Sequence, residues 1–108
     1  SKFVFPVEET TDESQLVQMQ EIEYNVLTTS KQGNIKVTLY DGSHVWLNAG
    51  SELRYPNAFV GNKRIVYLKG EAFFEVVKDD VHPFIVNTAS AVINVLGTSF
   101  NVNAYDVS

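Results

Sequence analysis

The chain has 108 residues, of which 44% are hydrophobic and 19% are charged, and its formal net charge is −5. This length and composition fit one globular domain with a single modest core, and they exclude a chain that is disordered throughout. The net negative charge disfavours nucleic acids and anionic membrane surfaces as partners, because both attract clustered Lys and Arg.

Cysteine is absent, which excludes a disulfide scaffold, a thiol nucleophile and a zinc site built on thiolates. No apolar run approaches the roughly 18 residues that a membrane-spanning helix needs. The stretch from Ser1 to Pro6 is too short for a signal peptide and lacks its charged start and apolar middle. We therefore expect the sequence to be a mature or excised soluble portion of a protein.

The first 23 residues differ in composition from the rest and are expected to form an acidic linker or N-terminal arm. Acidic residues stand here among Thr, Ser and Gln, with few large apolar side chains; they include Glu8, Glu9, Asp12 and Glu13. Such a stretch buries little surface. A short helix over residues 12–21 is an alternative, because Leu16, Met19 and Gln20 lie at helical spacing.

Residues 24–108 show the pattern of a β domain. Ile35, Val37 and Leu39 alternate with more polar neighbours, which places them on one face of a strand. Asp41-Gly42 follows and predicts a two-residue hairpin turn, because such a turn needs a positive φ that glycine adopts without strain. A second strand then resumes over residues 44–47.

Further short strands are expected over residues 64–68, 72–77, 84–86, 91–96 and 98–105. Short strands separated by turn residues predict an all-β fold, and we favour a jelly-roll-like antiparallel β-sandwich. A short twisted β-solenoid is the alternative. Its rungs would explain why three similar apolar segments, residues 45–47, 66–68 and 95–96, each end near or at a glycine.

Candidate metal-binding residues are few and isolated. His44 and His82 lie far apart, and neither stands at a metal-ligand spacing. Asp79-Asp80 lacks the series of oxygen ligands that a calcium loop requires, so a solvated turn is the favoured interpretation.

Candidate catalytic residues are equally unsupported. Ser43 and Ser51 have no nucleophile-elbow context. Glu71 and Glu75 share a strand face, but the strand rise separates them by roughly 13 Å, too far for a glycosidase carboxylate pair. The sequence therefore predicts no enzyme activity, no cofactor and no metal.

The aromatic residues of the β-patterned segments are the remaining candidates for a site. They are Trp46, Phe73, Phe74, Phe84 and Phe100. Core packing is the common role of aromatic residues in such segments, so we expect these residues in the core. The alternative is that they line a ligand groove.

Four motifs, in this order, resemble those of the FecR family. The first motif, residues 39–51, reads L-Y-D-G-S-H-V-W-L-N-A-G-S, and L-R-Y-P at residues 53–56 continues it. The second, residues 70–76, reads G-E-A-F-F-E-V; the third, residues 82–86, reads H-P-F-I-V; and the fourth, residues 95–102, reads V-L-G-T-S-F-N-V. Tyr40 and Phe73 depart from the Pro and Tyr that are frequent in the family.

The residues that carry the resemblance are turn and packing residues, so we expect mainly structural roles for them. They are Leu39, Asp41, Gly42, Trp46, Gly70, Glu71, Phe74, Glu75, His82, Pro83, Phe84, Gly97 and Phe100.

The resemblance implies a role in transcription regulation across the inner membrane of Gram-negative bacteria. FecR-like proteins are single-pass anti-sigma factors whose periplasmic region senses the signalling domain of a TonB-dependent outer-membrane transporter. The chain is similar to the periplasmic module, with residues 1–23 as a juxtamembrane linker. A cytoplasmic segment outside this chain would bind the extracytoplasmic-function sigma factor, and a C-terminal domain outside it is often implicated in transporter contact.

Contact with the transporter could then use a strand edge and β-augmentation, although the sequence does not show which strand forms the edge. A different class of function remains as an alternative: a carbohydrate-binding or adhesin-type β-sandwich. In it, Trp46 and Tyr55 would be stacking platforms beside Asn48, Asn57 and Asn62.

Overall fold

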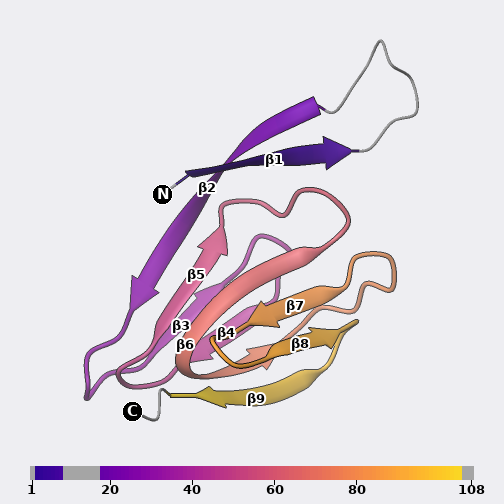
Figure 1. Ribbon diagram of the computed structural model, residues 1–108. Helices are drawn as coiled ribbons and strands as arrows, with labels where there is room; N and C mark the ends of the chain where they lie inside the picture. The colour runs from indigo at the N-terminus through magenta and orange to yellow at the C-terminus, as the bar shows by residue number, and fades with distance from the viewer. Residues whose placement is uncertain (1, 9–17, 106–108) are drawn as a thin grey trace.

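The structure is a computed structural model that describes residues 2–8 and 18–105. The described residues form nine strands and no helix, which confirms the all-β prediction (Figure 1). The strands are β1 (Lys2–Glu8), β2 (Gln18–Thr28), β3 (Ile35–Thr38), β4 (His44–Leu47), β5 (Glu52–Pro56), β6 (Arg64–Glu75), β7 (Phe84–Asn87), β8 (Val92–Val95) and β9 (Ser99–Ala104). Within these residues, no helix has the length and apolarity that crossing a bilayer requires.

The long strand β6 belongs to two layers of the sandwich. Its first part pairs with β5 and β7, and its second part, from Gly70 onward, pairs with β4 and β9. One layer therefore runs β2-β5-β6-β7-β8 and the other β3-β4-β6-β9. In Figure 1, β3 and β4 lie behind β6, whereas β7, β8 and β9 lie below it on the near side.

Strand pairing is antiparallel throughout the described sheet, with one exception. The exception is β6 and β7, which run parallel with Arg64 opposite Phe84. Hairpins such as β3–β4 and β7–β8 exclude the solenoid alternative, because the rungs of a solenoid pair in parallel.

The core lies between the two layers; alternate residues of β4 and β6 contribute to it, and β7 contributes three consecutive residues, Phe84, Ile85 and Val86. In β6, Val66, Leu68, Ala72 and Phe74 are buried, and Tyr67, Lys69, Phe73 and Glu75 are exposed. The Phe74 ring stacks on Phe100 with a centroid distance of 5.2 Å and meets the edge of Phe84 at 6.1 Å. Burying a side chain of this size contributes about 1.5–3 kcal/mol.

The β3–β4 hairpin forms where Asp41-Gly42 predicts it, but its loop is one residue longer. The Gly42 N–H donates to the Leu39 carbonyl (3.0 Å), and the Leu39 N–H donates to the Ser43 carbonyl (2.8 Å). Tyr40, Asp41 and Gly42 therefore form a three-residue loop. Gly42, the last residue of the loop, has a φ of 92°. Three-residue loops favour glycine at this position, because glycine adopts a positive φ without strain.

The predicted acidic arm contains strands where the structure describes it. Strand β1 pairs antiparallel with residues 18–23 of β2, and β2 continues across residue 24 to pair with β5. The alternative of a helix over residues 12–21 is wrong for residues 18–21, and residues 12–17 lie outside the described part. A helix of ten residues is marginal alone, so pairing with another strand outweighs its local spacing. The division of the chain at residue 23 stays a prediction.

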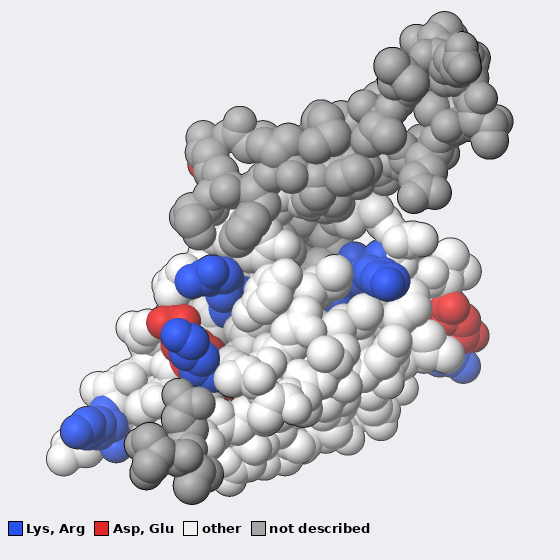
Figure 2. All heavy atoms as spheres, in the orientation of Figure 1, with Lys and Arg blue, Asp and Glu red and all other residues white. Residues whose placement is uncertain are grey.

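Charged side chains are unevenly distributed along the sequence and over the surface. From Val81 to Tyr105 the sequence has no Asp, Glu, Lys or Arg. This segment supplies β7, β8 and β9. Figure 2 shows the result: the surface below β6, where these strands lie in Figure 1, is free of charged residues over a wide area.

Candidate functional site

The most buried charge among the described residues is the guanidinium of Arg64, at the start of β6, whose residue is 3% exposed. Nη1 donates to Oδ2 of Asp41 and to the Val77 carbonyl, both at 2.8 Å. Nε donates to the His82 carbonyl (2.7 Å), and Nη2 donates to the Leu96 carbonyl (3.2 Å). One side chain therefore joins three loops that are distant in sequence.

These partners connect the four motifs to one another. Asp41 belongs to the first motif, Val77 follows the second, His82 opens the third and Leu96 lies in the fourth. We call Arg64 and these four partners the arginine hub. Its role is structural, because a buried guanidinium is stable only when its donors are satisfied.

Ser43 extends the hub and is not placed for nucleophilic chemistry. It is fully buried, and its Oγ donates to Oδ2 of Asp41 (2.9 Å) and accepts from the Val77 N–H (3.0 Å). Its N–H donates to Oδ1 of Asp41 (2.9 Å). The hydroxyl is thus used to hold the hairpin loop against the loop that follows β6.

A second polar cluster surrounds Gly70 and Glu71 at the bend of β6. Oγ of Ser51 accepts from the Glu71 N–H (2.9 Å), and it lies where a side chain on Gly70 would have to be. The Glu71 carboxylate accepts one hydrogen bond from the amide of Asn48 (2.9 Å) and one from the amide of Asn101 (2.8 Å). Glu71 therefore joins β9 and the residue after β4 to β6, and both of its carboxylate oxygens are engaged in these hydrogen bonds.

The loop between β6 and β7 is organised by Asp79. Its carboxylate accepts from the N–H groups of Val81 and His82 (3.0 and 3.1 Å) and contacts Nδ1 of the His82 ring at 2.8 Å. The hydrogen bond with the His82 ring, helped by the backbone donors, lowers the pKa of Asp79. No group of three metal-ligating side chains gathers in the described ranges.

The structure places the two histidines apart, each with a local partner. His82 contacts Asp79, whereas Nδ1 of His44 contacts Oγ1 of Thr38 on the neighbouring strand at 3.0 Å. Gly97, in the corner after β8, approaches Lys78 so closely that an added Cβ would lie 2.8 Å from the Lys78 backbone nitrogen.

The prediction that the aromatic residues form the core holds in part and is wrong for Trp46 and Phe73. Phe74 and Phe84 are fully buried and Phe100 is half-buried, but Trp46 and Phe73 are 37% and 38% exposed. Val45 and Leu47 point into the core, so the twofold period of β4 directs Trp46 outward. Phe73 lies opposite Trp46 on β6, with ring centroids 5.7 Å apart.

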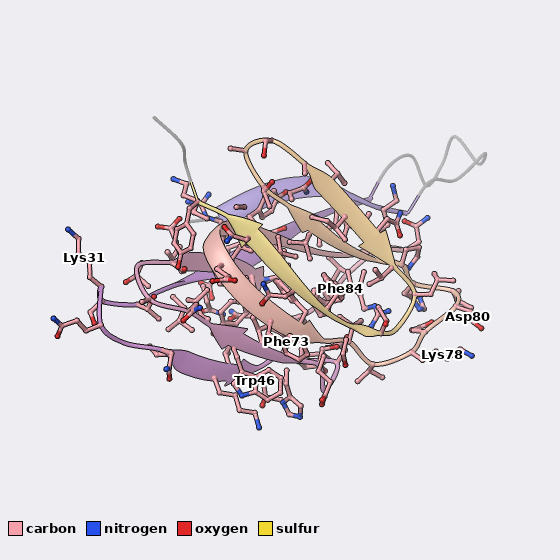
Figure 3. The ribbon with its side chains drawn as sticks, turned by 90° about the horizontal axis from the view of Figure 1, so that it is seen from below. Lys31, Trp46, Phe73, Lys78, Asp80 and Phe84 are labelled. Atoms are coloured by element: carbon pink, nitrogen blue, oxygen red, sulfur yellow. The ribbon has the colours of Figure 1, made fainter. Side chains whose placement is uncertain are left out.

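These two rings lie at the centre of a four-stranded outer face, which we call the aromatic face. It consists of Lys36, Thr38, His44, Trp46, Glu71, Phe73, Glu75, Ser99, Asn101 and Asn103 on β3, β4, β6 and β9, together with Asn48 directly after β4. Nζ of Lys36 lies 5.2 Å from the Trp46 ring centroid, and the His44 ring lies 5.9 Å from it. Figure 3 shows Trp46 and Phe73 on the outside of this layer and Phe84 inside the molecule.

The carbohydrate-binding alternative requires Trp46 and Tyr55 to form one stacking platform, but the structure places them on different layers. Trp46 is on the aromatic face, whereas Tyr55 on β5 packs against the core of the other layer. Asn57 is likewise engaged, since it accepts from Asn25 and donates to Glu23. A platform of Trp46 and Tyr55 is therefore not formed.

An all-β module that joins its loops through one buried ion pair and presents an aromatic face among polar residues is built like an interaction domain. Comparison with known protein families identifies the family of this module. The family model described as FecR protein matches residues 25–107, so the chain belongs to the FecR family. The predicted family is thereby confirmed.

Two crystal structures are similar to this chain over most of its length. Both are of a protein from Parabacteroides distasonis that is provisionally described as an anti-sigma factor. One is 44% identical, with a TM-score of 0.78 over 80% of this chain; the other is 45% identical, with a TM-score of 0.76 over 78%. The match spans 40% of each of those chains. Comparison with curated proteins finds no match.

Proposed function

We propose that this chain is the periplasmic relay domain of a FecR-type anti-sigma factor. The observation that carries the proposal is the FecR match over residues 25–107, together with 44% identity to a structure described as an anti-sigma factor. The relay passes the state of a TonB-dependent outer-membrane transporter to an extracytoplasmic-function sigma factor. The sigma factor is bound by a cytoplasmic segment of the longer protein, beyond a single membrane span.

The geometry supports a protein-binding role for the aromatic face in this relay. Exposed aromatic residues at the centre of a face with a polar rim are the usual composition of a protein interface core. The rim is pre-organised here, because Asn48 and Asn101 already hold the Glu71 carboxylate. Fixed side chains lose little entropy on binding, which favours recognition by such a face.

The test is calorimetric titration of this chain with the periplasmic signalling domain of the transporter encoded beside it. Micromolar or tighter binding supports recognition by this domain itself. Binding that requires the C-terminal region of the longer regulator would assign the domain a spacer role within the relay. Absence of binding by both forms would contradict the proposed relay.

A further inference from the structure

Strand β8 is an edge of its layer, and two of its residues direct their backbone groups away from the sheet. In the described structure β8 pairs only with β7. The Thr88 N–H donates to the Ala91 carbonyl (2.9 Å), which makes these two residues a hydrogen-bonded pair. Because such pairs alternate along an antiparallel ladder, Ile93 and Val95 bond to β7, whereas Val92 and Asn94 direct N–H and C=O outward.

This edge lacks the features by which proteins usually prevent strand addition. Exposed edges are commonly blocked by charged side chains, prolines or bulges. Residues 91–96 read A-V-I-N-V-L, with no charge and no proline, and the surrounding segment from Val81 to Tyr105 carries no charge. The edge strand β3, by contrast, carries Lys36, and β1 contains Lys2 and Pro6.

The side chains of β8 are also incompletely covered. Ile93 and Val95 pack against the core but are only half-buried, although they pair with fully buried Val86 and Phe84. Val92, on the other face, is 67% exposed. A further strand beside β8, with apolar residues at alternate positions, would cover Ile93 and Val95 as β7 covers them on the other side.

From these three observations we propose that the β8 edge is a strand-acceptor site. Its occupant is an extended, uncharged segment of a partner protein with alternating apolar residues, which pairs with the outward groups of Val92 and Asn94. A second copy of this chain is a weaker candidate, because four residues span only about 14 Å and a stable dimer buries about 1,000 Å² or more. Short contacts of this kind suit transient signalling complexes.

The experiment is residue-resolved amide exchange of the whole chain by NMR, alone and with a peptide probe. The probe is a peptide of alternating valine and threonine with a lysine at each end. We expect fast exchange at Val92 and Asn94 in the free chain, and slow exchange at Ile93 and Val95. The peptide should slow exchange at Val92 and Asn94 at least tenfold.

Two variants and a control distinguish strand addition at β8 from nonspecific binding of the peptide. Asn94→Pro removes an outward N–H and leaves the ladder to β7 intact, and Val92→Lys places a charge on the edge; both should abolish the protection. Val81→Lys is the control, because Val81 is a loop residue that is 73% exposed and lies off the edge. It should retain the protection.

Three outcomes would overturn the proposal. The first is unchanged exchange at Val92 and Asn94 in millimolar peptide. The second is protection that survives both edge substitutions. The third is protection of the free chain that grows with its own concentration, which would identify a second copy as the occupant. None of them depends on the transporter, so the result is independent of the proposed relay.

Discussion

The guanidinium of Arg64 lies 2.8 Å from the carboxylate of Asp41, although 23 positions separate the two residues in the sequence. Their side chains are 4% and 17% exposed, so the ion pair is largely removed from water. Arg64 completes its hydrogen bonding with carbonyls from two other loops. Through Arg64, loops that carry or adjoin all four motifs are held together in the fold.

Removing either partner of this ion pair should destabilise the domain strongly. We expect Arg64→Met and Asp41→Ala each to lower the free energy of unfolding by about 3–5 kcal/mol, because each leaves the other charge buried without its counterion. Urea denaturation monitored by circular dichroism measures the change.

The double variant and a second arginine provide the controls. The double variant should lose less than the sum of the single losses, since the pair is removed together. Arg54→Met should be much milder, because Nε of Arg54 is buried without a hydrogen-bond partner. Equal stability of Arg64→Met and the unsubstituted chain would show that the hub does not stabilise the fold.

Gly70, inside β6, and Gly50, in the turn before β5, form a matched pair of positive-φ positions. Both have positive φ, 94° and 63°, but an added Cβ on Gly70 would lie 2.9 Å from the Cα of Ser51, whereas Gly50 has free space. Gly50→Ala should cost about 1–2 kcal/mol from backbone strain alone. Gly70→Ala should cost clearly more, because β5 must also move. Thermal denaturation of both variants tests this order, and equal melting temperatures would contradict it.

The exposure of Trp46 predicts a small effect of its removal on stability. Trp46→Ala should cost about 1 kcal/mol, the range of a cross-strand pair on an exposed face. Phe74→Ala should cost about 3–5 kcal/mol, because that ring is fully buried against Phe84 and Phe100. Denaturant titration of both variants measures the two free energies of unfolding. A larger decrease for Trp46→Ala than for Phe74→Ala would show that Trp46 is a core residue.

Asp79 should make the stability depend on acid pH. Its pKa is lowered in the folded protein, mainly by the hydrogen bond with His82, so its contribution is present above the ordinary carboxyl pKa of about 3.8. That contribution is lost as the pH falls through the lowered folded pKa. Asp79→Asn should therefore lower the melting temperature at pH 7 and lower it less at pH 2.

Asp80→Asn is the control for this pH dependence. It removes the same charge from the neighbouring exposed position, and the structure gives Asp80 no contact with the His82 ring. Its melting temperature should differ little from that of the unsubstituted chain at both pH values. A constant effect of Asp79→Asn across the pH range would show that the carboxylate charge is not what stabilises the loop.

The strand pattern and the hairpin could be predicted from the sequence because both are local. Alternation in β4 and β6 and the positive φ of Gly42 follow from neighbouring residues alone, whereas Ile35 of β3, expected on the inward face, is 38% exposed. The motifs also predicted structural roles for Asp41 and His82, but Arg64, which bonds to both, was not identified from the sequence. Arg64 shares the inward parity of Val66 and Leu68, which was the available signal for its burial.

The remaining features depend on pairing between distant segments. Hydrophobicity predicted burial of Trp46, yet the side of β4 that faces the core is set by β6, which supplies Phe74 opposite Val45. Parallel strands need a long crossover connection between them. The first part of β6 pairs in parallel with β7, and the second part of β6, which lies in the other layer, forms part of the connection between them. No local pattern indicates such a division of one strand between two sheets.

The most direct test of the proposed relay is Trp46 fluorescence during titration with the transporter's signalling domain, made free of tryptophan. Trp46 is the only tryptophan in the sequence and lies at the centre of the aromatic face. Covering that face should shift the emission to shorter wavelength and protect the indole from acrylamide. Binding seen by calorimetry with unchanged emission and quenching would contradict recognition through this face.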